Sequence, residues 1–140
     1  MKFADFICPE AIRADLKTTD KEEVIREMTQ ALLDAGQIAE GEYESIVKGI
    51  LKREKLGSTG LWPGAAIPHT KHPSVDRLIG TAAISRQGVD FGSLDGELVH
   101  FFFLLISSAR DMEDHIRALS LITQWLHQDL SWISHPGEEC

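Results

Sequence analysis

The most informative stretch for the fold is LVHFFFLLI, residues 98–106. Its apolar centre, FFFLLI at residues 101–106, is six residues long, far short of the roughly 20 residues that cross a bilayer. A short, continuous apolar run is typical of a strand that is buried on both faces. The run therefore predicts a buried strand in a soluble protein.

Three amphipathic helices are predicted around this strand. The first begins after Asp20, which stands at capping-box spacing from Glu23, and ends before Gly36. The second covers residues 42–55, and the third begins at Asp111, whose side chain can act as the N-cap. Lysines 48, 52 and 55 of the second helix lie away from its apolar face, and we interpret them as a solvated surface.

Two further apolar segments, residues 65–67 and 78–85, predict short strands, and residues 88–96 predict connecting turns. Helices that alternate with apolar strands imply an α/β sandwich, a mixed and mostly parallel β-sheet flanked by α-helices. The 140 residues match the usual size of one domain, so we expect a single domain over residues 1–140.

Charge and cysteine content exclude several classes of protein. The formal net charge of −8 disfavours binding to nucleic acid, whose phosphate backbone attracts basic surfaces. Cys8 and Cys140 are the only cysteines, so the chain has no disulfide framework and no CxxC motif, which fits a reducing cytoplasm. The first residues include no sustained apolar segment, so we expect no secretion signal.

The segment REKLGSTGLWPGAAIPHT, residues 53–70, contains the densest cluster of residues suited to chemistry. Pro68 fixes its own φ and keeps Ile67 extended, so His69 is expected to emerge from the end of a strand in a defined direction. The glycines of this segment allow turns closed to other residues, and Ser58 and Thr59 supply donors that could face an anion.

A presented neutral imidazole can serve as a general base, a metal ligand or a nucleophile. The neighbours of His69 favour the chemistry of anions, because Arg53 supplies a planar charge suited to phosphate and Lys71 a second cation. Thr70, the next residue, is a further candidate for phosphate binding. Which ring nitrogen reacts is left open at this point, because tautomers depend on hydrogen bonds.

His115 is the second candidate histidine. Its spacing from Leu119 and Ile122 places it on the inward face of the third helix, near the positive end of the helix dipole. We therefore expect a neutral ring that can donate one N–H to an anion. A histidine at such a position is more often part of the core, so its functional role depends on pairing with His69.

Two alternative interpretations are a metal site and a serine hydrolase. His69, His72 and His115 could gather a metal ion, because imidazole suits zinc, although the loop contains no cysteine. A serine hydrolase is disfavoured because no serine lies in a G-x-S-x-G motif.

Read in order, the motifs resemble the mannitol/fructose-type enzyme IIA domains of the bacterial phosphotransferase system, including the nitrogen-regulatory members. The matching elements are Arg53-Glu54, STG at residues 58–60, AIPH at residues 66–69, Asp95-Gly96 and His115-Ile116. Together they cover nearly the whole chain.

The resemblance implies a mixed sheet flanked by helices and a phosphoryl-transfer component that needs no cofactor or metal. His69 would accept a phosphoryl group from phospho-HPr or its nitrogen-branch equivalent and pass it to an enzyme IIB component for sugar uptake, or use it as a regulatory signal. Arg53 would neutralise the phosphate charge, and His115 would hydrogen-bond to the acceptor site. Such a protein is cytoplasmic and is not inserted in a membrane.

The chain departs from the family pattern at two places. Residues 61–64, LWPG, make the loop before His69 bulkier, and the chain stops at Cys140, earlier than family members generally do. Either that end is trimmed or something else covers the exposed core, and in the second case we expect a homodimer formed through Trp125, Leu130 and Trp132. The alternative function is a regulatory binding module of the same fold that does not pass phosphate onward or is no longer phosphorylated.

Overall fold

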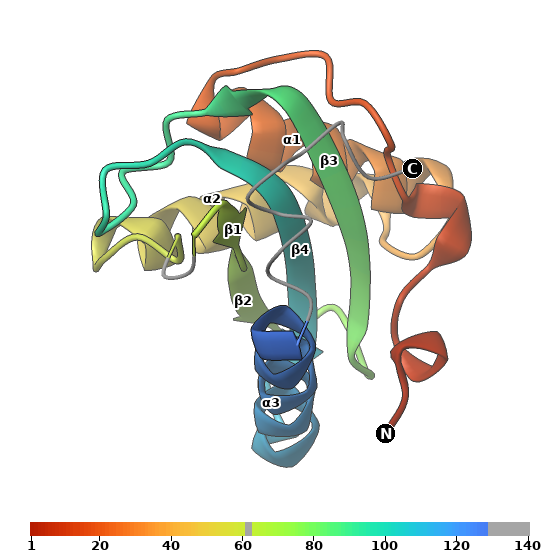
Figure 1. Ribbon diagram of the computed structural model, residues 1–140. Coiled ribbons are helices and arrows are strands. Elements are labelled where there is room, and N and C mark those ends of the chain that lie inside the picture. The colour runs from red at the N-terminus through yellow and green to blue at the C-terminus, as the bar shows by residue number, and fades with distance from the viewer. Residues whose placement is uncertain (61–62, 129–140) are drawn as a thin grey trace.

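The computed structural model describes residues 1–60 and 63–128, which form a sheet between two layers of helices (Figure 1). The helices and strands are α1 (Lys21–Asp34), α2 (Tyr43–Lys55), β1 (Ala65–Ala66), β2 (His69–His72), β3 (Ile79–Val89), β4 (Val99–Ser108) and α3 (Met112–Gln128). Three short 3-10 helices lie at Phe3–Asp5, Pro9–Ala11 and Glu40–Glu42.

Strand β4 is the centre of the sheet. β3 pairs with it in antiparallel orientation along residues 99–106, and β1 and β2 pair with it in parallel orientation at residues 101–102 and 105–108. Because β3 occupies one edge of β4, β1 and β2 follow one another along the other edge. Two of the three pairings are parallel, which confirms the mixed, mostly parallel sheet.

Alternate residues of β4 face opposite helical layers, as the period of two of a strand requires. The even-numbered residues from Phe102 to Ile106 pack in one hydrophobic cluster with α1 and α2. The odd-numbered residues from Phe101 to Leu105 pack in a second cluster with α3. Figure 1 shows α3 on one side of the sheet and α1 and α2 on the other. The strand predicted to be buried on both faces is confirmed.

The predicted helices and their caps are also confirmed. The carboxylate of Asp20 accepts the Glu23 N–H at 3.1 Å at the start of α1, and the carboxylate of Asp111 accepts the Asp114 N–H at 3.1 Å at the start of α3. These bonds satisfy N–H groups that have no partner in the first turn of a helix.

The structure differs from the expectation at two places. β3 continues to Val89 after an irregularity in its register that begins beyond Ile84, so the turns predicted from residue 88 begin later. Residues 69–72 form a strand, because their backbone pairs with residues 105–108 of β4, a contact that local sequence does not reveal.

Some expectations fall on residues whose structure is not described. Trp62, Leu130 and Trp132 lie outside the described residues, so the role of the bulky loop and the proposed dimer contacts stay predictions. Trp125 packs in the cluster between the sheet and α3, with its ring 5.8 Å from that of Phe103. No helix within residues 1–60 and 63–128 is long and apolar enough to cross a membrane.

Candidate active site

His69 is the first residue of β2, and its place in the sheet decides which way it points. It lies opposite Leu105 of β4 and therefore shares the face of the sheet that packs against α3. Its Nδ1 lies 2.8 Å from the carbonyl oxygen of Ile67. A carbonyl can only accept a hydrogen bond, so Nδ1 carries the proton and donates it. Nε2 of the neutral ring is therefore the nitrogen with a free lone pair.

His115, in the first turns of α3, meets His69 across this face. The centroids of the two rings are 5.1 Å apart, with the ring planes at 61°. Nδ1 of His115 lies 2.7 Å from the hydroxyl of Ser107. Ser107 was not predicted as part of the site, although the alternation of β4 identifies it, because residues 101, 103, 105 and 107 share one face.

Both histidines are neutral at pH 7. The pKa of His115 is lowered to about 4, mainly by burial, and to a smaller extent by the unfavourable interaction of a second positive charge with His69 in its protonated form and with Lys71. Burial is also the main reason why the pKa of His69 lies below its usual value. The hydrogen bond to the Ile67 carbonyl raises this pKa, and the positive charges of Arg53 and Lys71 lower it. The prediction that the His115 ring is neutral is confirmed. The predicted cause was the helix dipole, whereas the main cause is burial.

Arg53 lies in the last turn of α2, where it contributes positive charge to the site. Its Nη1 donates to the carbonyl oxygen of Gly57 at 2.8 Å, which holds the guanidinium beside the turn that follows the helix. The charge of Arg53 is among the causes that lower the pKa of His69, which places the two groups within electrostatic reach of each other.

Glu54 is a buried carboxylate next to Arg53, with its side chain 3% exposed. It forms an ion pair with Lys21 of α1 at 2.9 Å, and it accepts hydrogen bonds from the N–H of Thr59 at 3.2 Å and from the Thr59 hydroxyl. A buried charge is costly unless it is paired and hydrogen-bonded, and Glu54 meets both conditions.

A chain of hydrogen bonds leads from Glu54 to His69. Thr59, held by Glu54, accepts the Ile67 N–H at its carbonyl oxygen at 3.3 Å. Ile67 in turn accepts the Nδ1–H of His69. The motif match included Glu54, but nothing in the sequence indicated that its carboxylate holds the segment that orients His69.

The remaining predicted site residues have different positions. The Ser58 hydroxyl donates to the Phe91 carbonyl at 2.8 Å and accepts the Gly60 N–H at 3.0 Å, so it holds the loop together. Thr70 faces the α2 side of the sheet, where an added Cβ on Gly49 would lie 2.8 Å from its hydroxyl. Lys71 is exposed and lies on the same face as His69.

His72 lies on the face of β2 opposite to His69. Its Nδ1 accepts the Ser74 N–H at 3.1 Å, so Nε2 carries the proton and bonds to the Ser45 hydroxyl of α2 at 2.8 Å. The three histidines considered as metal ligands therefore do not converge. Within the described part of the chain, no group of three or more His, Cys, Asp and Glu side chains could hold a metal ion.

Comparison with known proteins supports the resemblance found in the motifs. The model of the family "Phosphoenolpyruvate-dependent sugar phosphotransferase system, EIIA 2" matches residues 5–131. A nitrogen regulatory protein of Bradyrhizobium diazoefficiens is 33% identical over 132 residues, which cover 94% of this chain and 84% of that protein. The fructose-specific EIIABC component of Bacillus subtilis is 33% identical over 129 residues, but the match spans 92% of this chain and 20% of that larger protein.

Solved structures agree with this assignment. The nitrogen regulatory protein IIA-Ntr from Neisseria meningitidis superimposes with a TM-score of 0.83 at 25% identity, covering 94% of this chain and 90% of that one. The IIA mannitol protein from Escherichia coli has a TM-score of 0.74 at 25% identity, covering 91% and 87%. The chain thus belongs to the EIIA 2 family of the phosphoenolpyruvate-dependent sugar phosphotransferase system, whose members are phosphotransfer or regulatory components.

Proposed function

We propose that this protein is a phosphohistidine carrier in which Nε2 of His69 accepts a phosphoryl group. The observation that carries the proposal is the hydrogen bond from Nδ1 of His69 to the Ile67 carbonyl, which leaves Nε2 unprotonated beside a second neutral histidine. The donor would be phospho-HPr or its nitrogen-branch equivalent. The acceptor would be an enzyme IIB component or a regulatory target.

The transfer step needs no metal or cofactor. The lone pair on Nε2 attacks the phosphorus atom, and the bond between phosphorus and the donor nitrogen breaks with its electron pair returning to the donor. The proton on Nδ1 stays in place, and the Ile67 carbonyl stabilises the positive charge that develops on the ring. Phosphoryl transfer mainly requires positioning and neutralised charge, which these residues supply.

Three groups would stabilise the phosphoryl oxygens, two of them by positive charge and the third by a hydrogen bond. Arg53 and Lys71 supply positive charge on the side of His69. If the Ser107 hydroxyl donates to Nδ1 of His115, the proton of that ring lies on Nε2, from which it can be donated to a phosphoryl oxygen. Ser58 and Thr59 are assigned to the loop that holds the site, because their hydroxyls are already bonded within the protein.

Exposed apolar side chains next to the site fit a protein donor and acceptor. Leu56 follows the helix that carries Arg53 and is 83% exposed, and Met112 and Ile116 flank His115 along α3 at 48% and 58% exposed. Apolar groups exposed around a functional group are typical of surfaces that bind other proteins.

The test is intact-mass spectrometry at alkaline pH after incubation with phosphoenolpyruvate, enzyme I and HPr. The wild-type protein should gain one acid-labile phosphoryl group, and His69→Ala should gain none. His72→Ala is the matched control, because it removes a histidine of the same strand from the other face, and it should still be phosphorylated. A folded wild-type protein that gains no phosphoryl group from charged HPr would instead support the binding module.

A second step distinguishes onward transfer from a regulatory role. The relative named as a fructose-specific EIIABC component favours transfer to enzyme IIB, and the relative named as a nitrogen regulatory protein favours regulation. Adding purified enzyme IIB to the phosphorylated protein should remove the phosphoryl group if the protein serves sugar uptake. Retention of the group in the presence of an active enzyme IIB would favour regulation.

A further inference from the structure

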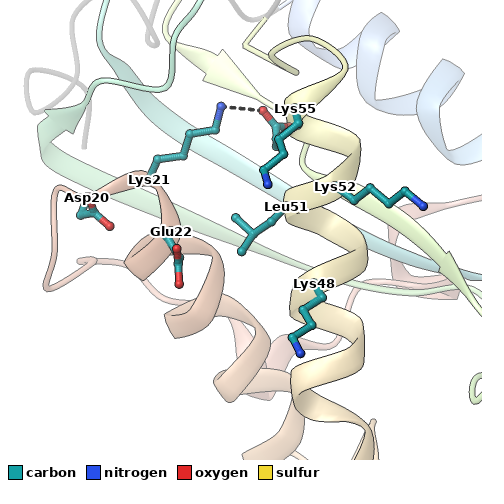
Figure 2. A pocket seen from close by; sticks show the side chains of 8 residues that line it. Asp20, Lys21, Glu22, Lys48, Leu51, Lys52 and Lys55 are labelled. Carbon is teal, nitrogen blue, oxygen red and sulfur yellow. Dashed lines mark ion pairs between the residues drawn. The ribbon is translucent and has the colours of Figure 1, made fainter.

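A groove of about 830 Å³ lies between the start of α1 and the second half of α2 (Figure 2). Its lining residues are Asp20, Lys21, Glu22, Lys48, Leu51, Lys52, Glu54 and Lys55. The groove belongs to the α1 and α2 layer, whereas His69 and His115 lie on the α3 face of the sheet. Its volume is within the range of roughly 300–1,000 Å³ found for binding pockets.

The negative charges of the groove already have partners. Asp20 caps α1, Glu22 forms an ion pair with Arg26 at 3.0 Å, and Glu54 is neutralised by Lys21.

The lysines of α2 do not have such partners. Within the described residues, Lys48, Lys52 and Lys55 form no ion pair within 4.0 Å. Lys48 and Lys55, the two of these lysines on the groove side of α2, therefore add positive charge that no ion pair neutralises to a chain whose formal net charge is −8, with Glu44 as a more distant electrostatic partner of Lys48. Such a charge distribution attracts and orients an anionic partner.

The arrangement of these side chains indicates the shape of that partner. Lys48, Leu51 and Lys55 follow one another at the spacing of a single helix face, with the partly exposed Leu51 between the two charges. Figure 2 shows Leu51 and Lys55 extending toward α1, Lys48 one turn further along α2, and Lys52 pointing away from them. Lys48 and Lys55 are seven residues apart, or roughly 10 Å along the helix.

We propose that this groove is a docking site for an acidic, amphipathic segment of a partner protein. Charges that do not converge on one point match acidic side chains spaced along such a segment better than they match a single small anion. Leu51 would contact an apolar side chain of the segment, and the flexible lysines would pair with the carboxylates around it. The site goes beyond the proposed phosphoryl transfer and does not depend on it.

The inner end of the groove is the ion pair between Lys21 and Glu54. A segment bound there would lie against the carboxylate that holds Thr59 and, through Ile67, the ring of His69. The docking site and the candidate active site thus share one structural element although they lie in different layers.

The test is a titration of the ¹⁵N-labelled protein with a synthetic helical peptide that has leucines at i, i+3, i+4 and i+7 and glutamates elsewhere. We expect the largest shifts of amide signals at Lys48, Leu51 and Lys55. A scrambled peptide of the same composition should bind weakly, and inorganic phosphate should not reproduce the shifts.

Two variants with equal changes in net charge complete the experiment. Lys48→Glu/Lys55→Glu should weaken binding of the patterned peptide by about tenfold or more, because it reverses the charges beside Leu51. Lys2→Glu/Lys17→Glu should weaken binding of the patterned peptide much less, since these exposed lysines lie outside the groove.

Four outcomes would overturn the proposal. An equal loss of peptide affinity in the two variants would mean that the peptide is attracted by net charge alone. Equal binding of the scrambled peptide would mean that the pattern of leucines and glutamates is not recognised. The same shifts with phosphate would identify a site for small anions. Shifts confined to the face of His69 would place the docking surface elsewhere.

Discussion

The two histidines of β2 differ in what surrounds their ring nitrogens. His72 faces α2, and both of its nitrogens are bonded, to Ser45 and to Ser74. His69 faces α3, and within the described residues only its Nδ1 is bonded, to the Ile67 carbonyl. We therefore expect opposite roles for these two imidazoles, because a fully bonded ring stabilises the fold and a half-bonded ring retains a nucleophilic nitrogen.

The largest expected effect separates these two histidines directly. His69→Ala should abolish phosphorylation and leave the free energy of unfolding nearly unchanged, because the ring makes a single hydrogen bond. His72→Ala should leave the rate of phosphorylation unchanged and lower the free energy of unfolding by about 1–3 kcal/mol, because it removes a buried ring together with its hydrogen bonds to Ser45 and Ser74. Phosphorylation assays and urea unfolding of both variants measure the two quantities. Equal stability losses in the two would show that His69 is also a structural residue.

Glu54→Gln tests whether the position of His69 depends on the buried carboxylate. The variant keeps the size of the side chain but removes the charge that pairs with Lys21, so we expect transfer to slow by about 10–100-fold, since misplaced catalytic groups lose rate steeply. Stability should fall by about 1–3 kcal/mol.

A ¹⁵N NMR spectrum of the His69 ring reports its tautomer, which a loss of stability alone would not change. In Glu54→Gln, the signal of the Nδ1–H tautomer should weaken relative to the wild type. Glu22→Gln is the control, because it removes an exposed carboxylate of the same groove, and its His69 spectrum should match the wild type. An unaltered tautomer signal in a folded Glu54→Gln protein would contradict the chain of hydrogen bonds as the cause.

Arg53→Lys asks whether the site needs a planar guanidinium or only a positive charge. An ammonium group is a point charge and cannot form two parallel hydrogen bonds to a phosphoryl group, so we expect transfer to slow by about tenfold. Single-turnover rates with phospho-HPr measure the effect, with Lys52→Arg as the matched control. An unchanged rate in Arg53→Lys would remove Arg53 from the site.

The last prediction concerns how the free energy of unfolding depends on pH through His115. Its pKa in the folded protein, about 4, is below the ordinary value of 6.5, so the folded state binds a proton less readily than the unfolded state. The stability due to the neutral ring is fully present above pH 6.5 and declines as the pH falls toward 4. Between pH 7 and pH 5 this amounts to about 2 kcal/mol.

Unfolding by urea at the two pH values, compared with His115→Asn, isolates this contribution. The wild-type protein should lose more stability than the variant when the pH is lowered, because asparagine does not titrate. Equal losses in both proteins would indicate that His115 is protonated in the folded state at pH 5.

Much of the fold follows from local patterns. The run at residues 101–106 predicted a strand buried on both faces, and the caps at Asp20 and Asp111 predicted where two helices begin. These patterns were sufficient because side-chain alternation and capping depend on neighbours within a few residues. The strand at residues 69–72 was missed because it forms only by pairing with β4.

Local sequence alone accounts for which residues are chemically suited to the site and for the backbone conformation close to them. Pro68 and the extended Ile67 present His69, and the spacing of α3 turns His115 inward. These are constraints on dihedral angles and on helical period, which a residue and its near neighbours decide.

How these residues act together depends on contacts between distant parts of the chain. The register of β2 against β4 turns His69 toward His115 and His72 away from it, and the packing of α1 on α2 brings Lys21 to Glu54. The free nitrogen of His69, the lowered pKa of His115 and the buried carboxylate that supports the loop all depend on these contacts. Each of them requires burial and partners supplied by distant parts of the chain, which no local pattern specifies.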